Sequence, residues 1–181
     1  MDSFLGLRAL SIEDAKEAFA QKFIIERGLK NKRIVINPDY RPKDDSEELT
    51  KALFDPNEGT LNFLRTYKYK TKSEVCATAR HETEHGWQFY LHARNTKGGE
   101  SEWEEKIYDL FRDLPKSLRK EAQNYTDSIS SYVTVAEDRV QYRKNFIEIK
   151  ANEAGKKARD LYDYERAGIQ KEFPHIPQEL L

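Results

Sequence analysis

The chemistry-bearing stretch of this chain is His81-Glu82-Thr83-Glu84-His85, an H-E-x-x-H sequence. In a helix, residues four apart lie on one face, so His81 and His85 can present two imidazole nitrogens to the same point. A zinc ion about 2 Å from each nitrogen fits that point. Glu82 is adjacent to His81, where its carboxylate can hold and deprotonate a metal-bound water. The motif therefore predicts a zinc hydrolase with Glu82 as general base; an exposed helix with incidental His and Glu is the alternative.

A catalytic zinc site needs a third protein ligand, and the motif helix does not offer one. His92 lies seven residues after His85. At a rise of 1.5 Å per residue it is about 10 Å further along the axis, too far to reach the same ion. The three-histidine pattern H-E-x-x-H-x-x-G-x-x-H is excluded, because this chain has Gln88 and Leu91 where that pattern needs Gly and His. His175 lies in a proline-rich segment and is a poorer choice than a downstream carboxylate.

The preferred third ligand is Glu148. Asn145 can cap a helix that carries Glu148 in its first turn. On that helix Glu148 shares a face with three residues, Ala151, Asn152 and Gly155. Small side chains on this face would let the helix approach the motif helix closely enough for the carboxylate to reach zinc. Glu153 is the alternative ligand, because Ala154 and Ala158 form a second small-residue face; a solvated Glu148 is the other alternative.

The two segments together resemble a known arrangement. H-E-x-x-H followed by E-x-x-A-[ND], present here as Glu148-Ile-Lys-Ala-Asn152, is similar to the gluzincin pattern of zincin metallopeptidases. The closest resemblance is to small intracellular and phage- or mobile-element-associated members, including the ImmA/IrrE-like peptidases. It covers residues 59–165. It implies that Glu148 is the third zinc ligand and that Asn152 supports one of the motif histidines.

Other positions follow from this arrangement. Gln88 lies one turn beyond His85 and can hydrogen-bond behind that ligand. A tyrosine or histidine that stabilises the oxyanion is expected, but the tyrosines, among them Tyr125, Tyr132 and Tyr142, cannot be separated by sequence. About 60 residues lie between His85 and Glu148, more than in many compact relatives. Residues 100–143 are therefore predicted to be a helical insertion.

The region before the motif is expected to hold one helix and two short strands. Apolar residues recur at helical spacing over 11–28, after a capping-box pattern. Two β-branched or alternating runs predict strands, at 33–37 and 59–64. The second of these would form either the edge of a substrate cleft or an ordinary core strand. Prolines and acidic residues over 40–58 predict a loop, with a helical turn around 46–54.

The rest of the chain reads as mainly helical. Thr71 followed by Glu74 is a capping-box pattern, so the motif helix is predicted to begin near Lys72. Helical patterns occupy 102–114 and most of 115–164, with a break around 143–145, and the tail 168–181 is expected to be irregular. These elements predict an α+β, mostly helical fold over residues 1–181 as a single domain. A sheet of two or three strands would pack on the motif helix, as in a minimal zincin-like core, with additional C-terminal helices.

Composition limits the function classes. The chain has 181 residues, with 31 basic and 32 acidic side chains, so no overall field attracts nucleic acid or an anionic membrane. No apolar run approaches the length of a membrane span, and the first residues do not resemble a secretory signal. Cys76 is the only cysteine, which rules out an internal disulfide, and it is expected to be a core residue. These features predict a soluble, cytoplasmic protein.

The function predicted from the sequence is a zinc-dependent metallopeptidase acting on a peptide or protein substrate. Two other functions stay open. One is a catalytically silent zinc-binding protein that works as an interaction or regulatory module. The other is a helical scaffold without a metal, which the metal content of the purified protein would distinguish.

Overall fold

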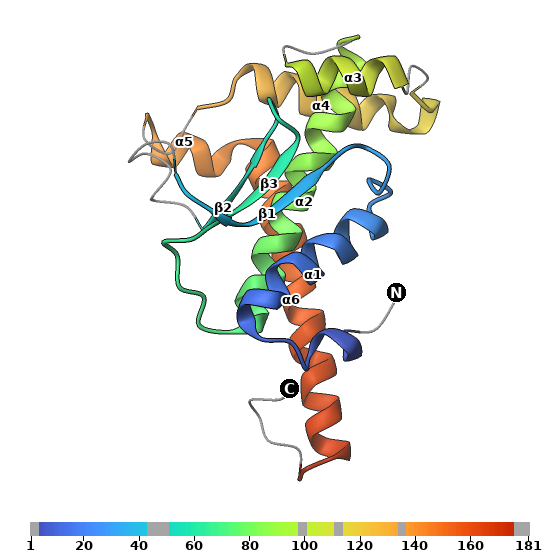
Figure 1. Ribbon diagram of the computed structural model, residues 1–181. Coiled ribbons are helices and arrows are strands. Elements are labelled where there is room, and N and C mark those ends of the chain that lie inside the picture. Colours follow the sequence, from blue (N-terminus) through green and yellow to red (C-terminus); the bar gives the residue numbers. More distant parts are fainter. Residues whose placement is uncertain (1–3, 43–50, 98–100, 111–113, 134–136, 176–181) are drawn as a thin grey trace.

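The computed structural model is mostly helical with one small mixed sheet, which confirms the predicted fold class (Figure 1). It describes residues 4–42, 51–97, 101–110, 114–133 and 137–175. The elements follow in the order η1 (Leu5–Leu7), α1 (Ile12–Glu26), β1 (Val35–Tyr40), β2 (Ala52–Asp55), β3 (Thr60–Leu64), α2 (Lys72–Asn95), α3 (Glu102–Leu110), η3 (Lys116–Leu118), α4 (Arg119–Ser130), α5 (Arg139–Lys144) and α6 (Phe146–Glu172).

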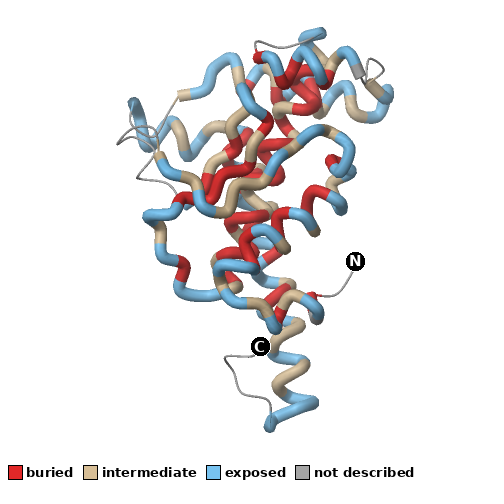
Figure 2. The backbone as a smooth tube through the Cα atoms, in the orientation of Figure 1, coloured by how far each residue is buried: buried red, intermediate tan, exposed pale blue. Residues whose placement is uncertain are grey.

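Helix α2, which carries the H-E-x-x-H sequence, is the central element. It begins at Lys72 as predicted, because the Thr71 hydroxyl accepts a hydrogen bond from the Glu74 backbone N–H at 3.1 Å. Helices α1, α3, α4 and α6 and strands β2 and β3 all contact it. Buried residues are accordingly concentrated along α2 and on the inner faces of its neighbours (Figure 2).

None of the described helices is long and apolar enough to cross a membrane.

The sheet has the strand order β1-β3-β2, with β1 parallel and β2 antiparallel to β3. The strand predicted at 59–64 is therefore the central one, so it is a core strand and not the edge of a cleft. Leu61 and Phe63 on this strand are fully buried. The edge that lies nearest the motif helix belongs to β2, which contacts α2.

Strand β2 corrects the prediction of a loop with a helical turn around 46–54. Residues 52–55 form a strand, and residues 46–50 lie outside the described part of the chain. The Phe54 ring packs against Phe89 and Trp103, with centroids 6.1 and 5.5 Å apart. These contacts and the pairing with β3 outweigh the local preference of Ala52 and Leu53 for helix.

Two element ends also differ from the prediction. Strand β1 continues past Asn37 through Pro38 to Tyr40, with a register shift on the way. An edge strand accepts proline, since its outward N–H needs no partner in the sheet. Helix α6 continues past Gly168 to Glu172, because one glycine lowers helix stability without ending a long helix. The predicted break around 143–145 is confirmed: α5 ends at Lys144 and α6 begins at Phe146.

Helix α6 lies alongside α2, and small residues bring the two backbones together. Cys76 of α2 is fully buried there, with its Sγ 3.8 Å from the Ala158 carbonyl oxygen. Burial raises the pKa of this thiol to about 12, which fits the predicted core role. At Gly155, an added Cβ would stand 2.7 Å from the Ala77 carbonyl oxygen and 3.4 Å from the His81 Cβ. The close approach on which the predicted site depends therefore requires glycine at position 155.

This contact predicts opposite effects for two glycine substitutions in α6. Gly155→Ala is expected to lower the free energy of unfolding by about 1–3 kcal/mol, because the new methyl group pushes against the α2 backbone. Gly168→Ala meets no atom within 4 Å and is expected to raise it by up to about 1 kcal/mol, through helix propensity alone. Chemical denaturation of both variants measures the difference. Equal effects of the same sign would contradict the packing described.

Candidate metal centre

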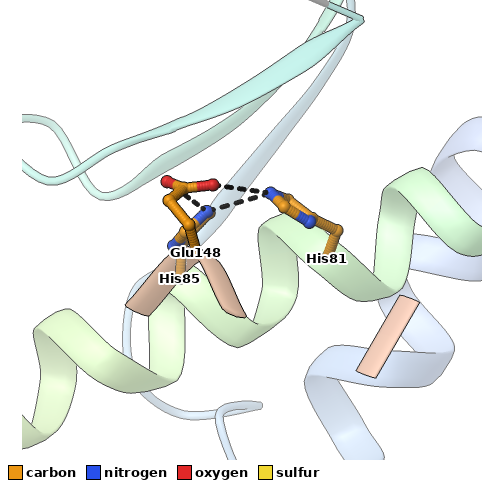
Figure 3. Close-up of side chains that lie close together, drawn as sticks. All are labelled: His81, His85 and Glu148. Atoms are coloured by element: carbon orange, nitrogen blue, oxygen red, sulfur yellow. Dashed lines mark hydrogen bonds and ion pairs between the residues drawn. The ribbon is translucent and has the colours of Figure 1, made fainter. Parts of the chain in front are cut away.

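Three side chains predicted as metal ligands meet at one point between α2 and α6 (Figure 3). The Nε2 atoms of His81 and His85 lie 3.0 Å apart. The Glu148 carboxylate, in the first turn of α6, points at both rings. Its Oε2 lies 3.7 Å from the His81 Nε2, and its Oε1 lies 3.4 Å from the His85 Nε2. Glu148 is only 1% exposed, so the predicted alternative of a solvated carboxylate does not apply.

These residues could hold a metal ion. Four ligands placed tetrahedrally around zinc at about 2.0–2.1 Å are about 3.3 Å from one another, close to the separations found here. The buried Glu148 Oε2 has no hydrogen-bond partner among the described residues. A buried carboxylate oxygen without a partner is costly, and a cation at this point would remove that cost. Two imidazoles and one carboxylate also form a common donor set for a catalytic zinc site.

Gln88 fixes the orientation and tautomer of His85. The Gln88 side-chain amide donates to the Ile147 carbonyl oxygen at 3.0 Å, so its oxygen is left as an acceptor. That oxygen lies 2.9 Å from the His85 Nδ1, which must then carry the ring proton. The Nε2 lone pair consequently points towards His81 and Glu148. The partner predicted for Gln88 is the one found, and it prepares His85 as a ligand.

Asn152 performs the corresponding task for His81. Its side chain accepts a hydrogen bond from the His81 ring, the role that the family resemblance implied for it. Burial and the neighbouring His85 lower the pKa of His81 to about 3, against the opposing effect of Asn152. His81 is therefore neutral near neutral pH, and the neutral imidazole is the form that binds a metal.

Glu82 is buried beside the three ligands. Its Oε1 lies 3.8 Å from the His81 Nε2, and its carboxylate accepts a hydrogen bond from the Phe54 backbone N–H of β2. Burial and the nearby Glu148 carboxylate raise the pKa of Glu82 well above its ordinary value. A carboxylate with a raised pKa is suited to accept a proton and hold it.

Two tyrosines from the segment predicted as a helical insertion reach the same carboxylate. The Tyr132 hydroxyl donates to the Glu148 Oε1 at 3.0 Å, and the Tyr142 side chain of α5 also hydrogen-bonds Glu148. Burial raises the pKa of both phenols, so both hydroxyls stay protonated as donors. Tyr125 instead packs against Phe146. The segment 100–143 thus contributes side chains to the centre.

Three other residues with side chains that can bind a metal lie away from the cluster of His81, His85 and Glu148. Glu153, the predicted alternative ligand, is exposed and pairs with Lys150 at 2.8 Å. His92 lies 3.3 Å from the Thr126 hydroxyl, away from His85, as the helix rise predicts. His175 is exposed and contacts Phe173.

A cleft of about 580 Å³ opens beside the centre. His81, Glu82 and Asn152 line it, as does Tyr142. Its other lining residues come from the start of β2 and from α2, α5 and α6: Lys51, Ala52, Ala77, Thr78, Arg139, Arg143, Gly155, Lys156 and Arg159.

The sequence did not single out the cations of this cleft. Arg139 and Arg143 are four apart in α5, and Lys156 and Arg159 are three apart in α6, so helical spacing places each pair on one face. No local signal says which face meets the cleft, because that depends on how α5 and α6 pack against α2.

Comparison of the chain with protein-family models, with curated proteins and with solved structures finds no match.

Proposed function

We propose that this protein is a zinc-dependent peptidase of the gluzincin type. The observation that carries the proposal is the buried cluster of His81, His85 and Glu148 with Glu82 beside it, at the wall of an open cleft. The cluster joins the H-E-x-x-H sequence to the Glu of E-x-x-A-N, and its donor set favours zinc over calcium or magnesium, which prefer oxygen ligands. The family resemblance and the zinc identity are parts of this proposal.

The side chains around the cluster can divide the work of peptide hydrolysis. Zinc held by His81, His85 and Glu148 would act as a Lewis acid and make a water molecule acidic enough to lose its proton near pH 7. Glu82 takes that proton and later gives it to the leaving amine. The Phe54 N–H holds the Glu82 carboxylate in place. Of the two tyrosines, Tyr142 lines the cleft, so we assign it to the oxyanion.

Strand β2 offers a template for an extended substrate. Lys51 and Asp55 direct their carbonyl oxygens to the Leu64 and Gly59 N–H groups, on the β3 side. Backbone groups alternate along a strand, so those of Ala52 and Phe54 face the outer edge. The Phe54 N–H is taken by Glu82, and Ala52 lines the cleft. A peptide that pairs with this edge would bring its scissile carbonyl past Glu82.

The experiment that tests this function combines metal content with cleavage. Purified protein is expected to contain about one zinc per chain by elemental analysis. A peptide library should be cleaved by the zinc-loaded protein, lose cleavage after chelation, and regain it when zinc is restored. Protein without stoichiometric metal would refute the site. Zinc without any cleavage of the library or of a cellular proteome would favour the silent interaction module.

A further inference from the structure

We propose that the substrates of this cleft carry acidic side chains, so that the protein selects acidic peptide segments. The inference rests on the proposed peptidase function, since it names the substrate class of the same site. Five of the residues that line the cleft are cationic, namely Lys51, Arg139, Arg143, Lys156 and Arg159. Among the described residues that line the cleft, Glu82 is the one acidic residue, and it is buried at the centre.

Most of these cations are available to a ligand. Among the described residues, Arg139, Arg143 and Lys156 have no carboxylate partner, and all three are exposed. Arg159 lies 3.9 Å from the carboxylate of its neighbour Asp160, while Lys51 already pairs with Glu74. Four cations on α5 and α6 therefore lack a strong internal partner. A cleft lined by one sign of charge focuses its field and attracts ligands of the opposite sign.

The excess of positive charge belongs to the cleft and not to the chain as a whole. The whole chain has 31 basic and 32 acidic side chains, so a general excess of cations does not explain a cleft with five of them. An interior site lined only by neutral groups would satisfy the proposed chemistry equally well. The cations therefore add a property that hydrolysis itself does not need, and selection of the substrate is the property that they can supply.

The cleft fits a peptide better than a nucleic acid. It contains the outer edge of β2, whose outward-facing backbone groups at Ala52 can pair with an extended peptide but not with a sugar-phosphate backbone. Nucleic-acid sites typically add aromatic platforms for the bases and a basic domain overall. Here Tyr142 is the one aromatic residue among the described lining residues, and its side chain is hydrogen-bonded to Glu148. The chain carries a net charge of −1.

The test measures binding rather than cleavage, so that it is independent of turnover. Zinc-loaded full-length Glu82→Gln protein is titrated into a fluorescent peptide of Glu and Ala residues, and into its Gln and Ala counterpart. Exposed charge pairs contribute about two- to fivefold each in affinity, so several pairs should favour the acidic peptide at least about tenfold at low salt. The preference should shrink as salt is raised.

A matched pair of double variants assigns the preference to the cleft. Arg143→Glu with Lys156→Glu should abolish or reverse the preference. Lys144→Glu with Lys157→Glu makes the same change in net charge at the adjacent residues, which do not line this cleft, and should keep it. Equal binding of the two peptides, or equal loss in both double variants, would overturn the inference. Tighter binding of a single-stranded oligonucleotide than of the acidic peptide, lost in the first double variant alone, would overturn it as well.

The two proposals can fail separately. Cleavage of acidic and neutral peptides at equal rates would keep the peptidase and refute the selectivity. Charge-dependent binding of the acidic peptide, without cleavage of any peptide by the wild-type protein, would keep the selectivity and refute the peptidase.

Discussion

Glu148→Gln is expected to lower zinc affinity by at least about 100-fold. Loss of a residue that only supports a zinc ligand costs up to about 100-fold in affinity, and Glu148 is itself a proposed ligand. Gln has the same shape as Glu, so the packing against α2 is preserved. The substitution removes the negative charge that faces the two histidines at 3.4 and 3.7 Å. Competition of each purified variant with a chromophoric zinc chelator gives the affinity, and circular dichroism verifies the fold.

Glu153→Gln is the matched control for this experiment. Glu153 lies in the same helix, receives the same chemical change, and is the other carboxylate that the sequence offered as a ligand. Its side chain is exposed and paired with Lys150, so zinc affinity should stay at the wild-type value. Loss of zinc in Glu153→Gln but not in Glu148→Gln would show that the register of α6 is wrong.

Glu82→Gln is expected to lower kcat by about 10²–10⁴-fold, the range that a positioned general base contributes. Zinc content should stay at the wild-type level, because Glu82 is not among the three clustered ligand atoms. The amide can occupy the same space near Phe54 but cannot take a proton from water. Turnover of a peptide found in the library screen, measured at equal zinc loading, gives the effect. Wild-type turnover in this variant would disprove the mechanism.

Glu84→Gln distinguishes loss of the base from loss of stability. Glu84 is buried two residues further along the motif and forms ion pairs with Arg27 at 2.7 Å and Arg80 at 3.3 Å. Its substitution removes the carboxylate that pairs with the half-buried Arg80 and leaves Arg27 paired with Glu121, 3.6 Å away. It should lower the free energy of unfolding by about 1–3 kcal/mol. The folded fraction should retain turnover, since this carboxylate pairs with arginines outside the metal cluster.

The sequence alone predicted those parts of the centre that depend on local rules. Thr71 and Asn145 cap the helices that carry the ligands, and each cap depends only on residues two or three positions away. Helix periodicity placed His81 and His85 on one face, and it excluded His92 by its distance along the axis. Gln88 was predicted from the same spacing, since it lies about one turn from His85, whereas the role of Asn152 was implied by the family resemblance.

The tertiary structure decided what depends on contacts between distant segments. The sequence preferred Glu148 as the third ligand but left Glu153 open as the alternative. The packing of α6 on α2 through Gly155 decided between them, because it buries the Glu148 carboxylate and leaves that of Glu153 in solvent. Strand β2 was missed because its pairing with β3 and the packing of Phe54 outweigh local preference. The two tyrosines and the cations of the cleft follow from where α4, α5 and α6 lie against α2. Local sequence determines which face a residue occupies on its own helix, whereas burial against other elements determines what that face meets.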